Sequence, residues 1–252
     1  MNKNKTALIT GGAKRIGKSM ALHLAKNNWN IAIQYNQSKD DVLKLKSEIS
    51  IYNIKFTAYK FNFTSNKNFE DFFNRMYRDF GQIDLLVNNA SIFDYDTIEI
   101  SDLKTFDNHI NVNLRAPFFL SKYFVKNLKN EGLIINILDQ RVNNITPYFT
   151  SYTISKCALE SLTKSLALYL APKIRVNGIS PGPTLQSKHQ TNNQFKNQIS
   201  KTPLLKRVEL NEINNAIDYI INCKSVTGQV LTIDSGQSLG WANSKSSNFS
   251  RD

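Results

Sequence analysis

The 252-residue sequence predicts a single α/β domain in which helices cover both faces of a mainly parallel, seven-stranded sheet. Seven short apolar runs alternate with stretches of helical apolar spacing, which is the pattern of consecutive strand–helix–strand units. Strands separated by helices cannot pair as hairpins, so right-handed crossovers should join them into one doubly wound sheet. The length suits one large α/β domain, and no linker rich in proline, glycine or serine divides the chain.

The apolar runs are the predicted strands. In chain order they lie at Thr6–Thr10, Ile31–Tyr35, Ile54–Phe61, Ile83–Asn88, Leu133–Leu138, Ile174–Ile179 and Gln229–Ile233. A long helix is expected from Ser151 to Leu170, and another is expected to begin near Glu209. The domain is expected to occupy residues 1–241, and residues 242–252 are predicted to be a disordered tail.

The stretch from Pro181 to about Arg207 has only weak periodicity and separates the sixth strand from the last predicted helix. A loop of this length in a compact domain is usually functional or mobile. We therefore predict a substrate loop at about residues 183–207. A solvated loop with a short helix is the alternative interpretation.

Composition and charge exclude several classes of protein. The chain is 41% hydrophobic and has no run of eighteen apolar residues, so no membrane span is predicted. Its first residues lack the apolar core of a signal peptide, which predicts a cytoplasmic protein. The net charge of +12 comes from scattered lysines, so we interpret it as compositional bias or attraction of an anionic substrate and predict no nucleic-acid partner. Cys157 and Cys223 lack metal-ligand spacing, and no metal is predicted.

The first predicted strand runs into a glycine-rich segment, TGGAKRIG at residues 10–17, and a helix follows it. Glycines at such a turn let the backbone bend tightly and let a pyrophosphate approach the free N–H groups at the helix N-terminus. Strand-to-helix turns also need glycine for purely steric reasons. The segment is therefore typical of a Rossmann dinucleotide-binding domain without being sufficient for one.

Tyr152 and Lys156 form a candidate acid–base pair. They lie four residues apart on the predicted helix, so their side chains share a face. A nearby ammonium favours the phenolate, and we expect it to lower the pKa of Tyr152 toward the working range of a general acid. The pair follows the fifth strand, as a site at the carboxyl ends of parallel strands requires.

Together with these motifs, further segments make the chain resemble the short-chain dehydrogenase/reductase family over nearly its whole length. The segments are TGGAKRIG, NNA at residues 88–90, Asn113 in INVNL, Tyr152 with Lys156, RVNGISPGP at 175–183 and TGQVLTIDSG at 227–236. The resemblance implies that Tyr152 donates a proton, that Lys156 holds the nicotinamide ribose and that Asn113 supports a proton-relay water. It also implies that Pro181 and Gly182 lie near the nicotinamide, and that the protein is a homotetramer.

The end of the second strand indicates the cofactor. A domain of this fold that uses NAD usually has an acidic residue there for the ribose 2′-hydroxyl, and the residues from Gln34 to Lys39 include none. We therefore predict NADPH, with Lys14, Ser38 and Lys39 as candidates to hold its 2′-phosphate. Asn62 stands where the family commonly has aspartate against the adenine. The full set of predicted cofactor-binding residues is Gly11, Lys14, Arg15, Ile16, Tyr35, Ser38, Asn62, Asn89, Ala90, Ser91, Tyr152, Lys156, Pro181 and Gly182.

Three residues depart from the usual family pattern, and together they indicate one branch of the family. Arg15 replaces the middle glycine of the glycine-rich turn, Asp139 replaces the serine that usually precedes the tyrosine, and Phe93 follows the NNA motif closely. This combination resembles the pteridine reductase branch, which includes bacterial dihydromonapterin and alternative dihydrofolate reductases. In that branch the aromatic ring and the nicotinamide sandwich a flat pterin, and the arginine contacts cofactor phosphate and substrate.

Each of these residues also has a structural alternative. Arg15 could be a solvated helix-start residue, Phe93 could serve packing, and Asp139 could cap a strand end. A carboxylate facing the tyrosine is costly if it is buried without a role, and its charge would oppose deprotonation of the tyrosine. We therefore group Asp139 with Tyr152, Lys156 and Asn113 as catalytic. The predicted substrate contacts are Arg15, Ser91, Phe93, Asp139 and Tyr152.

The predicted function is NADPH-dependent reduction of a dihydropterin or dihydrofolate to its tetrahydro form. One alternative is a reductase of an ordinary carbonyl, such as a 3-oxoacyl or sugar ketone, that uses the same tyrosine and lysine. The other is a non-catalytic NADP-binding regulatory protein, against which the presence of Tyr152, Lys156 and Asn113 argues.

Overall fold

The structure is a computed structural model that describes residues 4–65, 68–188 and 190–240. Its sheet has the strand order β3-β2-β1-β4-β5-β6-β7, and all neighbouring strands are parallel. The strands are β1 (Thr6–Thr10), β2 (Asn30–Tyr35), β3 (Phe56–Lys60), β4 (Leu85–Asn88), β5 (Gly132–Ile137), β6 (Ile174–Pro181) and β7 (Val230–Ile233). The prediction of a doubly wound Rossmann domain with seven strands is confirmed.

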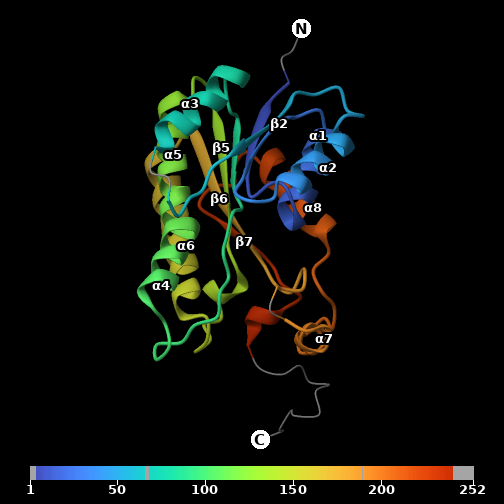
Figure 1. Ribbon diagram of the computed structural model, residues 1–252, viewed down its shortest axis with the longest axis vertical. Helices are drawn as coiled ribbons and strands as arrows, with labels where there is room; N and C mark the ends of the chain where they lie inside the picture. Colours follow the sequence, from blue (N-terminus) through green and yellow to red (C-terminus); the bar gives the residue numbers. More distant parts are fainter. Residues whose placement is uncertain (1–3, 66–67, 189, 241–252) are drawn as a thin grey trace, which may run out of the picture.

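Helices cover both faces of the sheet (Figure 1). One face carries α1 (Arg15–Lys26), α2 (Lys39–Ile49) and α8 (Leu210–Asn222), and the other carries α3 (Phe69–Phe80), α5 (Ala116–Asn127) and α6 (Thr150–Leu170). Each layer has its own apolar core against the sheet. Because both faces are covered, strands such as β1 and β4 are buried at every residue, which explains their unbroken apolar runs.

The predicted site residues gather at one edge of this sheet. The chain reverses its strand order between β1 and β4, and in such folds ligands bind outside the carboxyl ends of the strands at this point. The glycine-rich turn follows β1, Asn89 follows β4, Asp139 follows β5, and Pro181 ends β6. The topology therefore brings segments that are distant in sequence to a common edge.

The helix predicted from Ser151 to Leu170 is α6, and α8 begins at Leu210, directly after its N-cap residue Glu209. The predicted substrate loop at 183–207 contains a helix of its own, α7 (Asn192–Ser200). The predicted tail at 242–252 lies outside the described residues. Within the described ranges, no helix is both long enough and apolar enough to cross a bilayer.

Candidate active site

The turn after β1 is tightly enclosed. Gly11 has a φ of +60°, and a Cβ there would lie 3.1 Å from the Cα of Ala90. A Cβ at Gly17, in the first turns of α1, would lie 2.3 Å from the carbonyl oxygen of Gly11. A side chain would clash with the backbone at Gly17 and is disfavoured by the left-handed φ at Gly11, which explains both glycines and leaves the backbone open to a close ligand.

Two side chains hold this turn in shape. The carboxamide of Asn89 donates hydrogen bonds to the carbonyl oxygens of Thr10, at 2.8 Å, and Gly11, at 3.3 Å. The carboxamide of buried Gln34 accepts from the Gly11 N–H at 2.9 Å and donates to the carbonyl oxygen of Phe61. The ends of β1, β2 and β4 are thus joined around the N-terminus of α1, which fits a dinucleotide pyrophosphate.

Arg15 links the glycine-rich turn to the predicted substrate loop. Its φ is +55°, a left-handed conformation that is uncommon for any residue with a side chain. Its Nη1 donates to the carbonyl oxygen of Gln186 at 2.9 Å, and its Nη2 donates to that of Leu185 at 3.2 Å. The contacts of Arg15 with a phosphate or a substrate remain predictions.

The end of β2 offers no carboxylate to an adenosine ribose. Tyr35 is half-buried there, Ser38 is the N-cap residue of α2, and Lys14 is exposed at the start of α1. The carboxamide oxygen of Asn62, after β3, accepts hydrogen bonds from the N–H and hydroxyl of Thr64, which fix its orientation. The residues at this end of the site fit a cofactor with a 2′-phosphate.

Asp139 and Tyr152 meet just beyond β5. The Tyr152 hydroxyl donates a 2.9 Å hydrogen bond to Oδ2 of Asp139. The other oxygen, Oδ1, accepts from the backbone N–H of Arg141 at 2.9 Å and so caps the short 3₁₀ helix η2 (Gln140–Val142). One oxygen of this carboxylate therefore has a capping role, and the other faces the tyrosine.

The environment of Tyr152 keeps its proton in place. Burial raises the pKa of Tyr152 well above its ordinary value, and the negative charge of Asp139 raises it further, as expected for that carboxylate. The prediction that Lys156 lowers this pKa is wrong, because burial and the carboxylate outweigh any effect of the ammonium. The Lys156 ammonium donates instead to the carbonyl oxygen of Ile137 at 2.8 Å, and burial lowers its own pKa to about 8. Tyr152 is thus held in its protonated form at neutral pH.

Asn113 lies fully buried in the π-helical segment η1 (Asn111–Arg115). Its Oδ1 accepts from the Ile92 N–H at 3.0 Å and the Ser91 hydroxyl at 3.1 Å. Its Nδ2 donates to the Ile92 carbonyl at 3.1 Å and the Ser155 hydroxyl at 3.0 Å. These four bonds use the two acceptor and two donor positions of a carboxamide, so this side chain positions the loop before Phe93. The relay water implied by the family resemblance remains a prediction.

Phe93 belongs to an aromatic cluster that sequence reasoning found only in part. It stacks on Phe149 with ring centroids 4.2 Å apart and 10° between the planes, and the Tyr152 ring meets it edge-to-face at 4.7 Å. Arg141 lies beside both phenylalanines and pairs with Asp139, with Nη1 and Oδ1 3.2 Å apart. Phe149 and Arg141 were missed, and their only sequence signal is their nearness to Tyr152 and Asp139. Stacking of Phe93 on a substrate remains a prediction.

Sequence reasoning also missed a chain of buried hydrogen bonds that runs through Ser151, the residue next to Tyr152. The Ser151 hydroxyl donates to Asp96 Oδ2 and accepts from Nδ1 of His109 at 2.6 Å, while Nε2 of His109 accepts from the Asp94 N–H at 3.2 Å. Burial lowers the pKa of His109, which agrees with a neutral ring. The chain fixes the start of α6 on the loop after β4. In the described part of the chain, no three His, Cys, Asp or Glu residues gather to hold a metal ion.

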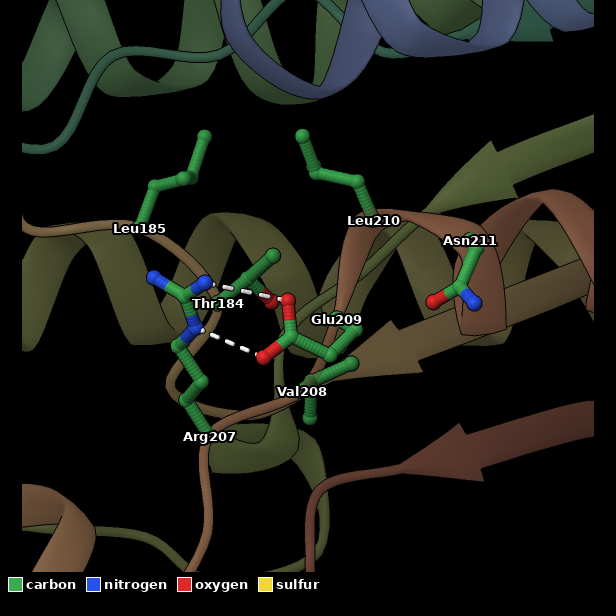
Figure 2. A pocket seen from close by; sticks show the side chains of 7 residues that line it. All are labelled: Thr184, Leu185, Arg207, Val208, Glu209, Leu210 and Asn211. Carbon is green, nitrogen blue, oxygen red and sulfur yellow. Dashed lines mark hydrogen bonds and ion pairs between the residues drawn. The ribbon is translucent and has the colours of Figure 1, made fainter.

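The ends of β6 and β7 form the opposite side of the edge. A Cβ at Gly182 would lie 2.6 Å from the Cα of Asp234, so the chain after Pro181 packs directly on the turn after β7. Beyond it lies a pocket of about 350 Å³, lined by Thr184, Leu185, Arg207, Val208, Glu209, Leu210 and Asn211. Figure 2 shows Arg207 paired with Glu209 on one side of this pocket, between the start of the predicted substrate loop and the start of α8.

Comparison with known proteins identifies this arrangement. Residues 11–238 match the family described as enoyl-(acyl carrier protein) reductase, a group of short-chain reductases. The chain belongs to the short-chain dehydrogenase/reductase family. This short-chain oxidoreductase is 31% identical to an uncharacterized oxidoreductase of Thermotoga maritima, over 93% of this chain and 97% of the relative. It is 29% identical to a 3-oxoacyl-[acyl-carrier-protein] reductase FabG of Staphylococcus epidermidis, over 92% of this chain and 98% of the relative.

Two solved structures are also similar to this chain. The FolM alternative dihydrofolate reductase 1 of Brucella canis, complexed with NADP, is 38% identical and superposes with a TM-score of 0.91 over 97% of this chain and 98% of that protein. Its counterpart from Brucella suis, also in complex with NADP, gives the same identity and TM-score. The predicted resemblance to the pteridine and dihydrofolate reductase branch is confirmed, and the NADP in both structures agrees with the predicted cofactor.

Proposed function

We propose that this short-chain reductase uses NADPH to reduce a dihydropterin or dihydrofolate to its tetrahydro form. The observation that carries the proposal is the 2.9 Å hydrogen bond from Tyr152 to Asp139, at a position where the family usually has serine. A serine hydroxyl can only hydrogen-bond a ketone oxygen, whereas a carboxyl group can also exchange a proton with the tyrosine or a ring nitrogen. The 38% identity with FolM dihydrofolate reductases supports the same substrate class.

NADPH, when bound, supplies the hydride for the carbon of the ring C=N bond. The residues proposed to hold it surround the glycine-rich turn and the end of β2, with Lys14 and Ser38 toward the 2′-phosphate. Asn89, Ala90 and Ser91 follow β4, Pro181 and Gly182 follow β6, and Lys156 is proposed to bind the ribose.

Side chains of the protein are proposed to donate the proton and to replace it. Tyr152 is proposed to deliver it to the ring nitrogen, and the raised pKa of Tyr152 keeps its hydroxyl protonated before the transfer. Tyr152 is only 5% exposed, whereas the Asp139 side chain is 19% exposed and is hydrogen-bonded to it. Asp139 is thus the group through which the buried tyrosine can be reprotonated from solvent.

Phe93, Ser91 and Arg15 are the proposed substrate contacts beside this proton donor. A flat ring held against Phe93 would meet the nicotinamide in one orientation, and such orientation makes the transfer effectively unimolecular. Ser91 is fixed by its hydrogen bond to Asn113, and Arg15 reaches the loop that begins at residue 183.

The 29% identity with FabG favours a second candidate, a reductase of ordinary carbonyl compounds that uses the same Tyr152 and Lys156. Oxidation of NADPH, followed by its absorbance, distinguishes the two. The substrates are dihydrobiopterin, dihydromonapterin, dihydrofolate, a 3-oxoacyl thioester and a sugar ketone. Turnover with a dihydropterin or dihydrofolate that greatly exceeds turnover with the ketones supports the proposal. Turnover with ketones alone makes the carbonyl reductase the better interpretation.

We also propose a homotetramer in the cytoplasm, as the family resemblance and the sequence suggest. Large apolar side chains are exposed on three neighbouring helices: Leu103 on α4 (Leu103–Ile110), Phe118 on α5 and Ile154 on α6. Burying such side chains against a second copy would remove them from water. Sedimentation equilibrium at several concentrations measures the mass, and a monomer throughout would contradict the proposal.

A further inference from the structure

Arg141 joins the proton donor to the aromatic pair. Its backbone N–H and its Nη1 both donate to Oδ1 of Asp139, at 2.9 and 3.2 Å. The carboxylate is therefore clamped at Oδ1 by one residue, which leaves Oδ2 directed at the Tyr152 hydroxyl. The two side chains are only 15% and 19% exposed, so solvent screens this ion pair less than one on the open surface.

The guanidinium lies along the shared flank of the two phenylalanines. Its Cζ is 5.2 Å from the Phe93 centroid and 5.1 Å from the Phe149 centroid. The rings are nearly parallel and 4.2 Å apart, so a guanidinium on the outer face of one would be much farther from the other. The near-equal distances therefore place Arg141 beside the pair and not on an outer ring face.

Two further features accompany these contacts of Arg141. Its Nε is buried, and no acceptor for it occurs among the residues that the structure describes. An apolar side chain of similar length would avoid that cost. Phe149 also has a left-handed φ of +58°, a strained conformation that places it at the N-terminus of α6, three residues before Tyr152.

We propose that Arg141 is a positioning residue that holds the Asp139 carboxylate and the Phe93–Phe149 pair as one unit, so that a flat substrate ring bound at the pair is aligned with the proton donor. This inference rests on the proposed function. Each of these residues contacts the next, and the last contacts the first: Arg141, Asp139, Tyr152, Phe93 and Phe149. The positive charge of Arg141 also opposes the rise in the pKa of Tyr152 that Asp139 causes.

The test compares Arg141→Met with Arg141→Lys, measuring kcat and KM for a dihydropterin, the Kd of NADPH and the melting temperature. Met keeps the length but removes the charge, so we expect kcat to fall by about tenfold or more and KM to rise, with an unchanged Kd. Lys keeps a charge near Asp139 but loses the planar guanidinium. We expect it to restore most of kcat while KM remains raised by about two- to tenfold.

Arg75→Met is the matched control. Arg75 on α3 also pairs with a carboxylate, with its Nε 3.5 Å from Oδ2 of Asp71, and lies near the ring of Phe72. The Arg75→Met variant should leave kcat, KM and the Kd of NADPH unchanged. The inference is overturned if Arg141→Met has wild-type kcat and KM, or if Met and Lys lose activity, cofactor binding and thermal stability in parallel. A wild type that reduces no dihydropterin or dihydrofolate contradicts the proposed function instead, and the same variants are then compared on the ketone that it does reduce.

Discussion

Asp139→Asn is the most informative single change, because asparagine keeps the shape and the capping ability of aspartate but not its charge. In the wild type, Oδ1 accepts from Arg141 and Oδ2 accepts from the Tyr152 hydroxyl. An asparagine must turn its NH₂ group toward one of these donors. If the amide oxygen stays on Arg141, the tyrosine hydroxyl loses its acceptor.

The lost bond is one to a charged acceptor, which is worth roughly 1.5–3 kcal/mol. If Asp139 stabilises the transition state by the same amount, its loss lowers kcat/KM for a dihydropterin by about one to two orders of magnitude. Asp139→Ser, with the residue usual in the family, should lose a similar factor. In both variants the negative charge that raises the pKa of Tyr152 is gone, so that pKa falls. Because the protonated tyrosine is the active form, the decline of activity at high pH should begin at a lower pH than in the wild type.

Steady-state kinetics on a dihydropterin at several pH values, with the Kd of NADPH measured alongside, tests both expectations. Asp102→Asn is the control: Asp102 caps α4 by accepting from the Thr105 N–H at 2.6 Å, so this variant removes a capping charge elsewhere. Unchanged rates and an unchanged high-pH limb in both Asp139 variants would refute the reasoning. Asp139 would then be only the cap of η2, and the carbonyl reductase would be the better interpretation.

Three further outcomes are expected. Tyr152→Phe should lower kcat by about 10²–10⁴-fold with the Kd of NADPH nearly unchanged, and near-normal turnover would mean that another group donates the proton. NADPH should be strongly preferred to NADH, and Lys14→Ala should weaken NADPH binding by about one to two orders of magnitude without affecting NADH; equal kcat/KM with both cofactors would contradict this. Arg15→Gly relieves a left-handed φ but removes both hydrogen bonds to the loop carbonyls of Leu185 and Gln186. Limited proteolysis within residues 183–207 should therefore be faster, and an unchanged cleavage rate would show that Arg15 does not hold the loop.

The sheet could be predicted because its central strands are buried on both faces and therefore appear as apolar runs. The errors lie at the ends of strands: the sixth strand, predicted to end at Ile179, continues to Pro181. The fourth strand was predicted from Ile83, but Asp84 turns its carboxylate to the Thr6 N–H at 2.8 Å, and the ladder with β1 begins at Leu85. The third strand was predicted from Ile54, which lies in the preceding turn, and pairing with β2 begins at Phe56.

The site was predicted less completely, because spacing along a helix gives a shared face but not the surroundings of that face. Tyr152 and Lys156 do lie on α6 as expected, yet burial and Asp139 decide the direction of the tyrosine's pKa shift. Burial depends on segments as distant in sequence as Phe93 and His109, which contact the Tyr152 ring. Arg141 and Phe149 belong to the site through the same tertiary contacts, which no local pattern announces.

The two interpretations of Asp139 that the sequence leaves open are not exclusive in the structure. A cap needs one acceptor oxygen, and Oδ1 provides it to the Arg141 N–H. Capping alone does not require aspartate, since asparagine and serine cap about as well. What they cannot supply is a negative charge on the second oxygen, and that oxygen faces the hydroxyl of a buried tyrosine whose pKa the charge raises. The cap alone therefore does not explain aspartate at this strand end, because both Tyr152 and Arg141 contact a charge that asparagine and serine lack.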